Sequence, residues 1–362
     1  DTNDSATFSY VAGRLKSTKQ WSALGPPGAG GTYTNVQAIA EDATYVYFGG
    51  DFTNFDSIAA ADQIVRYNKA TGTYSALGTG ATGGAVNCLA ITPNGDLIAG
   101  GSFTLMGGVA NTVRIARWNG TAWSALGTGA NANSVRSLAV LLNGNIVAGG
   151  DFTLMGGVAN TVRIAQWNGT AWSALGTGAN ASGVNGLAVS HIDGSLFAGG
   201  DFTIMGGVAN TTYIARWDGS VWNALSTGMG AGGVNTVTVD PNTNLLYIGG
   251  GFIAAGGVSA VRIASWNGTT FLPLGVGADN SVYSMDVGPD GTLIVSGFFS
   301  SVGGITLADR IARWNGYSWA HLDIDLPGTP IVYNVFASQY ADSVVRQQYS
   351  LYLGFDTTGT GN

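Results

Sequence analysis

The sequence has few charged residues and almost no lysine. Only 10% of its 362 residues are charged, and 14 basic against 21 acidic side chains give a formal net charge of −7. Its three lysines are Lys16, Lys19 and Lys69. Because proteins that bind nucleic acid neutralise phosphates with a basic surface, this composition excludes nucleic acid as an expected partner.

Cysteine, histidine and long apolar runs are also scarce. Cys88 is the only cysteine and lies in the apolar pattern Val86–Ala90, so we expect a buried side chain rather than a reactive thiol. The two histidines, His191 and His321, have no partner at the spacing of metal ligands or of a catalytic triad. The sequence therefore predicts no catalytic residue, no metal and no cofactor. No apolar run reaches the roughly 18 residues of a membrane helix, so membrane insertion is not expected.

Glycine is abundant, with 58 residues, and it recurs in a fixed context. An apolar run ends in a glycine doublet and is followed by an aromatic residue, as in Gly149-Gly150-Asp151-Phe152. The motif returns about every fifty residues, which is the period of a kelch-type propeller blade and is longer than a WD40 blade. The aromatic positions are Phe52, Phe103, Phe152, Phe202, Phe252 and Phe299.

Each unit has the pattern of four short strands joined by turns. Asn143-Gly144 and Asn168-Gly169 separate alternating apolar runs in the third unit, and Asn-Gly is the strongest signal of a two-residue hairpin turn. The four expected strands of that unit are 135–140, 145–148, 162–167 and 171–175. No helical periodicity appears over a useful length, so the fold class is all-β.

Counting the first strand of each unit predicts a seven-bladed β-propeller of four-stranded blades. The seventh unit contains only two strands, and residues 9–25 resemble the missing third and fourth strands. We therefore expect the N-terminal strands to complete the last blade, so that the sheet has no large open edge. The chain is expected to be one domain, 1–362, with blades at 36–77, 86–126, 135–175, 184–225, 234–274, 282–322 and 332–355 plus 9–25.

Large aromatic residues recur at two positions of the third and fourth strands. Because they occupy one register in nearly every unit, we expect them to fill the wedge between blades, where each buries roughly 150–250 Å². Stacking on sugar rings is the alternative interpretation. The tryptophans of this set are Trp118, Trp123, Trp167, Trp172, Trp217, Trp222, Trp266, Trp314 and Trp319.

The glycine doublet followed by two spaced aromatics resembles the kelch repeat of galactose oxidase-like β-propellers, over essentially the whole chain. The longer motif Gly-Gly-Asp-Phe-Thr … Ile-Ala-Arg-Trp-Asn-Gly-Thr-Ala-Trp is similar to repeats of bacterial surface proteins and phage virion proteins. This resemblance implies an extracellular, cell-surface or virion location and a role in interaction. The copper site of galactose oxidase-like enzymes needs two histidines and a cysteine cross-linked to tyrosine, and His191 and His321 lie at unrelated positions.

Three acidic residues at one register, Asp51, Asp151 and Asp201, are the candidates for carboxylate chemistry on a polysaccharide. Because they repeat, we interpret them as cross-strand polar contacts instead. The expected partners are Arg66 for Asp51, Arg216 for Asp201 and Gln166 for Asp151.

The longer connections lie on one face of such a propeller, and long loops on a rigid scaffold are the usual binding surface. The candidate binding residues of these loops are Met106, Met155, Met205, Asn111, Asn160 and Asn210. The methionines form either an adaptable contact patch or a plug between loops. We expect a non-enzymatic interaction module that binds a glycan or a protein on a surface or within a virion or filament. The alternatives are a polysaccharide-acting enzyme and a purely architectural subunit.

Overall fold

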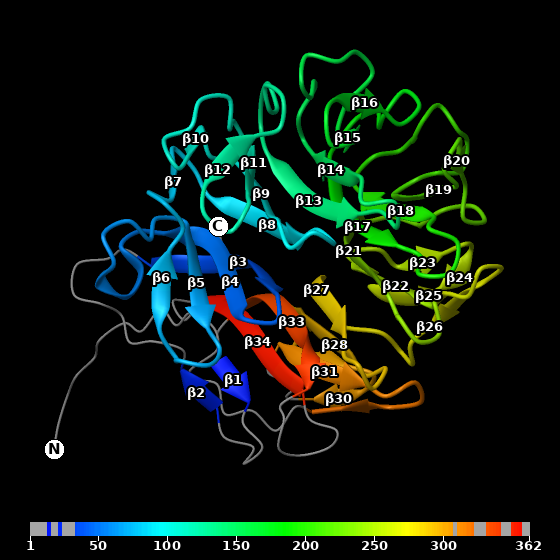
Figure 1. The fold of residues 1–362 in the computed structure, drawn as a ribbon. Coiled ribbons are helices and arrows are strands. Elements are labelled where there is room, and N and C mark those ends of the chain that lie inside the picture. Colours follow the sequence, from blue (N-terminus) through cyan, green and yellow to red (C-terminus); the bar gives the residue numbers. More distant parts are fainter. Residues whose placement is uncertain are drawn as a thin grey trace, which may run out of the picture.

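The computed structural model describes the backbone of residues 13–15, 21–23, 33–306, 310–321, 331–341 and 349–356. Side chains are described at 35–306, 310–321 and 335–337. Six antiparallel four-stranded sheets surround a common axis, with the first strand of each sheet nearest that axis (Figure 1). The chain is therefore a β-propeller, as its repeats predict.

The six sheets form blades of consecutive repeats. The first three blades are β3 (Tyr33–Glu41), β4 (Tyr45–Phe52), β5 (Ile64–Asn68) and β6 (Tyr74–Ala76); β8 (Val86–Ile91), β9 (Leu97–Gly101), β11 (Ile115–Trp118) and β12 (Trp123–Ala125); and β13 (Val135–Val140), β14 (Ile146–Gly150), β15 (Ile164–Trp167) and β16 (Trp172–Ala174). The next three are β17 (Val184–Val189), β18 (Leu196–Gly200), β19 (Ile214–Trp217) and β20 (Trp222–Asn223); β21 (Val234–Val239), β22 (Leu246–Gly250), β25 (Ile263–Trp266) and β26 (Phe271–Pro273); and β27 (Val282–Val287), β28 (Leu293–Gly297), β31 (Ile311–Trp314) and β32 (Trp319–Ala320).

Shorter elements lie in the connections between these strands. They are the 3-10 turn η1 (Phe55–Ser57), the pair β7 (Ala81–Thr82) and β10 (Leu105–Met106), the pair β23 (Ala254–Ala255) and β24 (Val258–Ser259), and the pair β29 (Ser301–Val302) and β30 (Ile305–Thr306). The pair β7–β10 joins the connection before the second blade to a loop within that blade, so the long loops are themselves hydrogen-bonded together.

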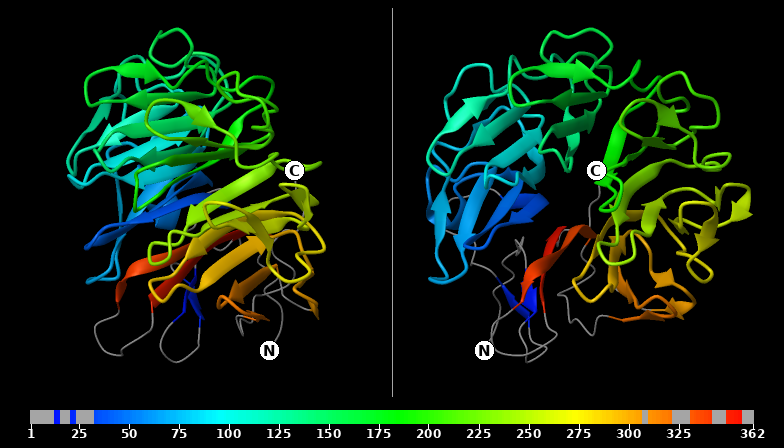
Figure 2. Two further views of the ribbon diagram at one scale, coloured as in Figure 1. Left: turned by 90° about the vertical axis from the view of Figure 1, so that its right-hand side faces the viewer. Right: turned by 45° about the vertical axis from the view of Figure 1, so that its right-hand side comes forward.

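The prediction of seven four-stranded blades is wrong, because the described residues form six four-stranded sheets. The C-terminal strands β33 (Ile331–Ala341) and β34 (Tyr349–Asp356) form a two-stranded sheet between the sixth blade and the first (Figure 2). The N-terminal strands β1 (Gly13–Leu15) and β2 (Trp21–Ala23) form a separate two-stranded sheet, and β1 lies beside β34. Among the described strands no ladder joins these two sheets.

The sequence argument failed here because it counted strands rather than hydrogen-bonded sheets. The segment aligned with a third strand is described as strand only at Gly13–Leu15, and the rest of 9–25 outside β2 lies beyond the described residues. Leu15 pairs with Trp21 at the register where the second blade pairs Trp118 with Trp123. The N-terminal segment therefore lacks the tryptophan that its repeat equivalents carry in the third strand.

Four tryptophans of the fourth strands lie at the interface with the preceding blade. Trp172 is 5% exposed, and its ring centroid lies 5.4 Å from that of Trp167 on the adjacent strand. Its indole Nε1 donates a hydrogen bond of 2.8 Å to the carbonyl of Leu126 in the preceding blade. The same bond joins Trp123 to Leu77, Trp222 to Leu175 and Trp319 to Leu274, at 2.8, 2.9 and 3.0 Å. Each such indole therefore contributes both packing area and a satisfied buried donor to the blade interface.

Two kinds of close approach require glycine in the third repeat. A Cβ atom on Gly149 would lie 2.7 Å from Val184 Cγ1 of the next blade, and one on Gly150 would lie 2.1 Å from the carbonyl of Ser134. In the loop after β14, a Cβ on Gly156 would lie 2.5 Å from Cδ1 of Trp172. The glycine doublets thus allow neighbouring blades and loops to pack closely.

Candidate binding site at the mouth of the central cavity

The innermost strand of every blade carries a β-bulge directly after its first buried valine. In β13 the register shifts between Val135 and Ser137, so Arg136 is left without a partner opposite it. A bulge redirects the side chains of a strand and is frequent next to functional sites. The six bulged residues, which we call the bulge ring, are Gln37, Asn87, Arg136, Asn185, Asn235 and Tyr283.

The bulge ring lines a central cavity of about 380 Å³ that the innermost strands enclose. Three of its amides connect neighbouring blades by donating to the carbonyl of the next blade's first valine. These bonds run from Asn87 to Val135, from Asn185 to Val234 and from Asn235 to Val282, at 3.3, 3.0 and 2.9 Å. The ring therefore combines a structural role with a polar lining for the cavity.

Arg136 departs from this amide pattern. Its Nε donates to Oδ2 of Asp151 at 2.5 Å, and another guanidinium nitrogen donates to Oδ1 of Asn185 at 3.1 Å. The side chain is 46% exposed, so the ion pair is accessible to water and screened by it. Arg136 thus places a positive charge at the rim of the central cavity.

A second, wider cavity of about 670 Å³ adjoins this residue on the long-loop face. We call it the arginine pocket because three of the chain's few basic residues line it, together with a single carboxylate. Its lining consists of Ser102, Arg114, Asn133, Ser134, Arg136, Asp151, Arg163, Ala181 and Ser182. The guanidinium groups outnumber the carboxylate, so the pocket is locally positive in an acidic protein.

Arg114 and Arg163 occupy equivalent positions immediately before the third strand of their blades. Both have a φ of 64°, in the left-handed region that bulky residues seldom adopt. The conformation is fixed by backbone bonds on both sides: Arg163 N donates to Phe152 O, and Gly150 N donates to Arg163 O. One guanidinium nitrogen of each arginine donates to a loop carbonyl, that of Ala130 for Arg114 and of Ala179 for Arg163. The fold therefore holds both side chains in defined positions.

The predicted loop residues divide into two groups. Met106, Met155 and Met205 are fully buried, and each forms an isolated bridge or short pairing with the preceding loop, as Met155 does with Ala130. Of the two interpretations of these methionines, the plug between loops fits this burial, and an exposed contact patch does not. Asn111, Asn160 and Asn210 are exposed on the long-loop face with φ of 61–62°. Their predicted role in binding stays a prediction.

The expected cross-strand partners of the repeated aspartates are wrong. The residues opposite Arg66, Arg216 and Gln166 are Tyr47, Phe197 and Val147. The glycine doublet carries each aspartate beyond the end of the third strand and beside the innermost strand instead. Asp51 lies opposite Asn35 in the ladder, Asp151 contacts Arg136, and Asp201 accepts a 3.0 Å hydrogen bond from Asn185.

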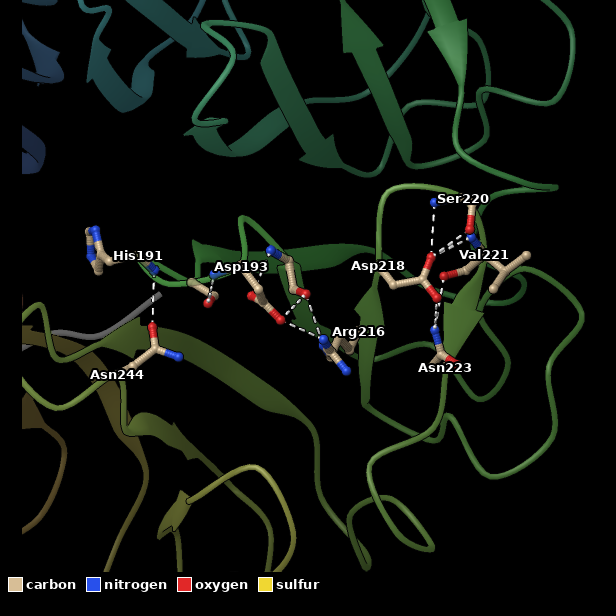
Figure 3. A network of polar contacts seen from close by, with 10 residues as sticks. His191, Asp193, Arg216, Asp218, Ser220, Val221, Asn223 and Asn244 are labelled. Carbon is tan, nitrogen blue, oxygen red and sulfur yellow. Dashed lines mark hydrogen bonds and ion pairs between the residues drawn. The ribbon is translucent and has the colours of Figure 1, made fainter.

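Arg216 belongs to a polar network on the opposite, tight-turn face of the fourth blade (Figure 3). Its NH2 donates to Oδ2 of Asp193 at 2.6 Å, and Ser195 Oγ donates to the same carboxylate at 2.9 Å. Although partial burial opposes the effect, hydrogen bonds from serines and Arg216 hold the pKa of Asp193 well below its usual range. The adjacent turns are also linked, since His191 N donates to Oδ1 of Asn244 at 3.0 Å. This face is built of hairpin turns that bond to one another.

Two ionisable side chains of the innermost strands have raised pKa values. Burial raises the pKa of the Cys88 thiol, in agreement with the prediction of a buried, unreactive cysteine. Burial and the negative charge of Glu41 raise the pKa of Asp286 to about 7, against hydrogen bonds from two backbone N–H groups.

Within the described residues, no three or more histidine, cysteine or carboxylate side chains are grouped as metal ligands. In the same part of the chain, no helix has the length and apolar character needed to cross a membrane.

Comparison with known proteins supports the β-propeller class. The chain is similar to the Rax2 C-terminal beta propeller domain over residues 16–195, just under half of its length. Among solved structures it is similar to the WD40 beta propeller domain of Doa1, with a TM-score of 0.55 and 14% sequence identity over 89% of this chain and 93% of that one. No curated protein sequence matches the chain. These likenesses support the fold, whereas the expected kelch or galactose oxidase type is not confirmed.

Proposed function

We propose that this chain is a non-enzymatic interaction module that works outside the cell or on a virion and holds its partner on the long-loop face. The arginine pocket carries the proposal, because it is a concave site of ligand-binding size that combines charged and hydrogen-bonding groups. Fold alone does not assign function, so the argument rests on this site. The external location rests on the composition and on the repeats' resemblance to those of surface and virion proteins.

The repeated aspartates have partners that suit a structural role rather than acid–base chemistry. Asp151 is held by Arg136 and Asp201 by Asn185. A carboxylate already engaged by the protein's own guanidinium or amide groups is less free to contact the two sides of a glycosidic bond, as a glycosidase needs. This pairing favours binding over catalysis as the role of the long-loop face.

Selective blocking of one face tests the proposal. Because Cys88 is buried, a single cysteine introduced on the surface can be conjugated to a bulky polymer without labelling the native thiol. Ala181→Cys places the polymer at the arginine pocket, and Tyr317→Cys places it at a tight turn where the native side chain is 92% exposed. Binding of the labelled conjugates is then measured on intact cells and on arrays of glycans and extracellular proteins.

The expected result is saturable binding that the polymer at position 181 abolishes and the polymer at position 317 leaves intact. Absence of saturable binding to every surface would overturn the interaction role. Loss of binding only with the polymer at position 317 would overturn the assignment of the long-loop face.

A further inference from the structure

We infer that the arginine pocket binds an acidic peptide segment of a partner protein, with the partner's carboxylates placed between Arg114 and Arg163. The inference rests on the proposed function and specifies the chemistry of its ligand. The pocket gathers three guanidinium groups from the second and third blades, in a chain whose formal net charge is −7. A locally positive pocket on a negatively charged protein attracts and orients anionic groups, although the net charge of the protein repels them.

The two outer arginines retain unused donor capacity. A guanidinium carries five N–H donors. Within the part of the chain that the structure describes, Arg114 and Arg163 each make one hydrogen bond, of 3.2 and 3.1 Å, to a loop carbonyl. The Nε of Arg114 is buried, so the donors left for a carboxylate there are those of its terminal nitrogens. A carboxylate matches the guanidinium fork with two parallel bonds.

The third arginine shows that a carboxylate fits this environment. The Asp151 carboxylate lies in the pocket and accepts a 2.5 Å hydrogen bond from Arg136, so it serves as an internal example of the ligand group. This internal pair favours a carboxylate as the ligand group.

The rest of the lining favours a peptide over a sugar. All lining residues are described, and none is aromatic, so the pocket offers no flat ring face for a sugar to stack on. Ser102, Asn133, Ser134 and Ser182 instead supply hydroxyl and amide groups. Such groups both donate and accept, as needed to pair the N–H and C=O groups of an extended peptide.

Fluorescence anisotropy of a labelled hexaglutamate peptide at low salt tests the inference, with hexaglutamine as the uncharged probe. We expect hexaglutamate alone to bind, and its affinity to fall with rising salt. Arg114→Gln and Arg163→Gln are the test variants, since Gln63 occupies the equivalent position in the first blade with a φ of 60° and glutamine therefore fits there. Each variant should weaken binding about tenfold, as loss of a charged hydrogen bond does.

Arg262→Gln is the matched control. Arg262 has the same left-handed conformation, with a φ of 65°, and the same bond to a loop carbonyl, but it does not line the pocket. It should leave hexaglutamate affinity within about twofold of the unmodified protein, well inside the tenfold step expected of a charged bond. An equal loss in this control, or no loss in the test variants, would overturn the inference. Tighter binding of an oligogalacturonate than of hexaglutamate would overturn the peptide assignment in favour of an acidic sugar.

The two proposals fail in distinguishable ways. If hexaglutamate does not bind but the polymer at position 181 still abolishes cell binding, the acidic-peptide ligand is wrong and the interaction role stands. If hexaglutamate binds and the arginine variants respond as expected while no cell or array surface is bound, the pocket chemistry is correct and the proposed function fails.

Discussion

The glycine pair Gly156-Gly157 in the loop after β14 allows a sharp test of blade packing, because only the first of the two glycines lies against a tryptophan ring. Gly156 and Gly157 have φ of 61° and 73°, so alanine at either position costs about 1–2 kcal/mol in left-handed backbone strain. A Cβ on Gly156 would also lie 2.5 Å from Cδ1 of Trp172, whereas a Cβ on Gly157 would have no atom within 4 Å. Overpacking of this kind costs about 1–3 kcal/mol. Gly156→Ala should therefore destabilise the protein by about 2–5 kcal/mol, and Gly157→Ala by about 1–2 kcal/mol.

Urea unfolding followed by tryptophan fluorescence measures this difference. The urea concentration at the midpoint of unfolding should fall further for Gly156→Ala than for Gly157→Ala. The slope of the unfolding free energy against urea concentration should stay unchanged. Trp172→Ala removes the ring that the new methyl group meets, so the double variant with Gly156→Ala should show a favourable coupling of at least about 1 kcal/mol. Equal destabilisation by the two alanines, or no coupling in the double variant, would refute the role assigned to the tryptophan.

Three further predictions concern individual polar groups. Trp172→Phe removes the donor to the Leu126 carbonyl and should lower the unfolding free energy by about 1–3 kcal/mol in urea titrations; a loss below about 0.5 kcal/mol would contradict it. Folded Asp286, with its pKa raised to about 7, retains a proton that the unfolded chain releases near pH 4, so stability should fall as pH rises from about 4 to 7. Asp286→Asn should flatten that part of the profile, and an unchanged slope would exclude this carboxyl as its source. Asp193→Asn breaks an exposed ion pair and should cost under about 1 kcal/mol, less in high salt, when measured by thermal unfolding.

The sequence predicted well those features that each repeat encodes locally. The Asn-Gly turns fix their hairpins through backbone conformation alone, and Asn143-Gly144 and Asn168-Gly169 both separate paired strands in the structure. The buried position of Trp172 also followed from its register, because a large aromatic residue repeated in successive blades has a repeated wedge to fill.

The blade count and the candidate site depended on information that no single repeat contains. Whether β1 and β34 join into one ladder depends on pairing between the two ends of the chain, which strand patterns do not reveal. The partner of Asp151 depended on the bulge at Arg136, which moves every following residue of β13 relative to β14. A regular alternation of strand residues cannot predict such a shift.

The sequence also contains a signal of the arginine pocket. Arginine directly precedes Ile-Ala at Arg114 and Arg163, and Arg136 stands where neighbouring blades carry asparagine. Arginine also precedes Ile-Ala at Arg262 and Arg310, so only Arg136 departs from the repeat pattern, and its approach to Arg114 and Arg163 requires the radial arrangement of blades two and three. Repeat alignment therefore identifies Arg136 as exceptional, and only the fold places it beside the other two arginines.

The bonds from indole to leucine carbonyl all run in one direction, from each blade to the one before it. A single repeat therefore contains both halves of the contact, a donor for its predecessor and an acceptor for its successor. Such an interface is head-to-tail rather than symmetric. The number of repeats that can join is therefore set by the geometry of ring closure, because every added repeat brings a new donor and a new acceptor. Duplication of a fifty-residue unit would consequently supply its own interfaces on both sides. The near-identical second, third and fourth repeats have the composition that growth by such duplication would leave behind.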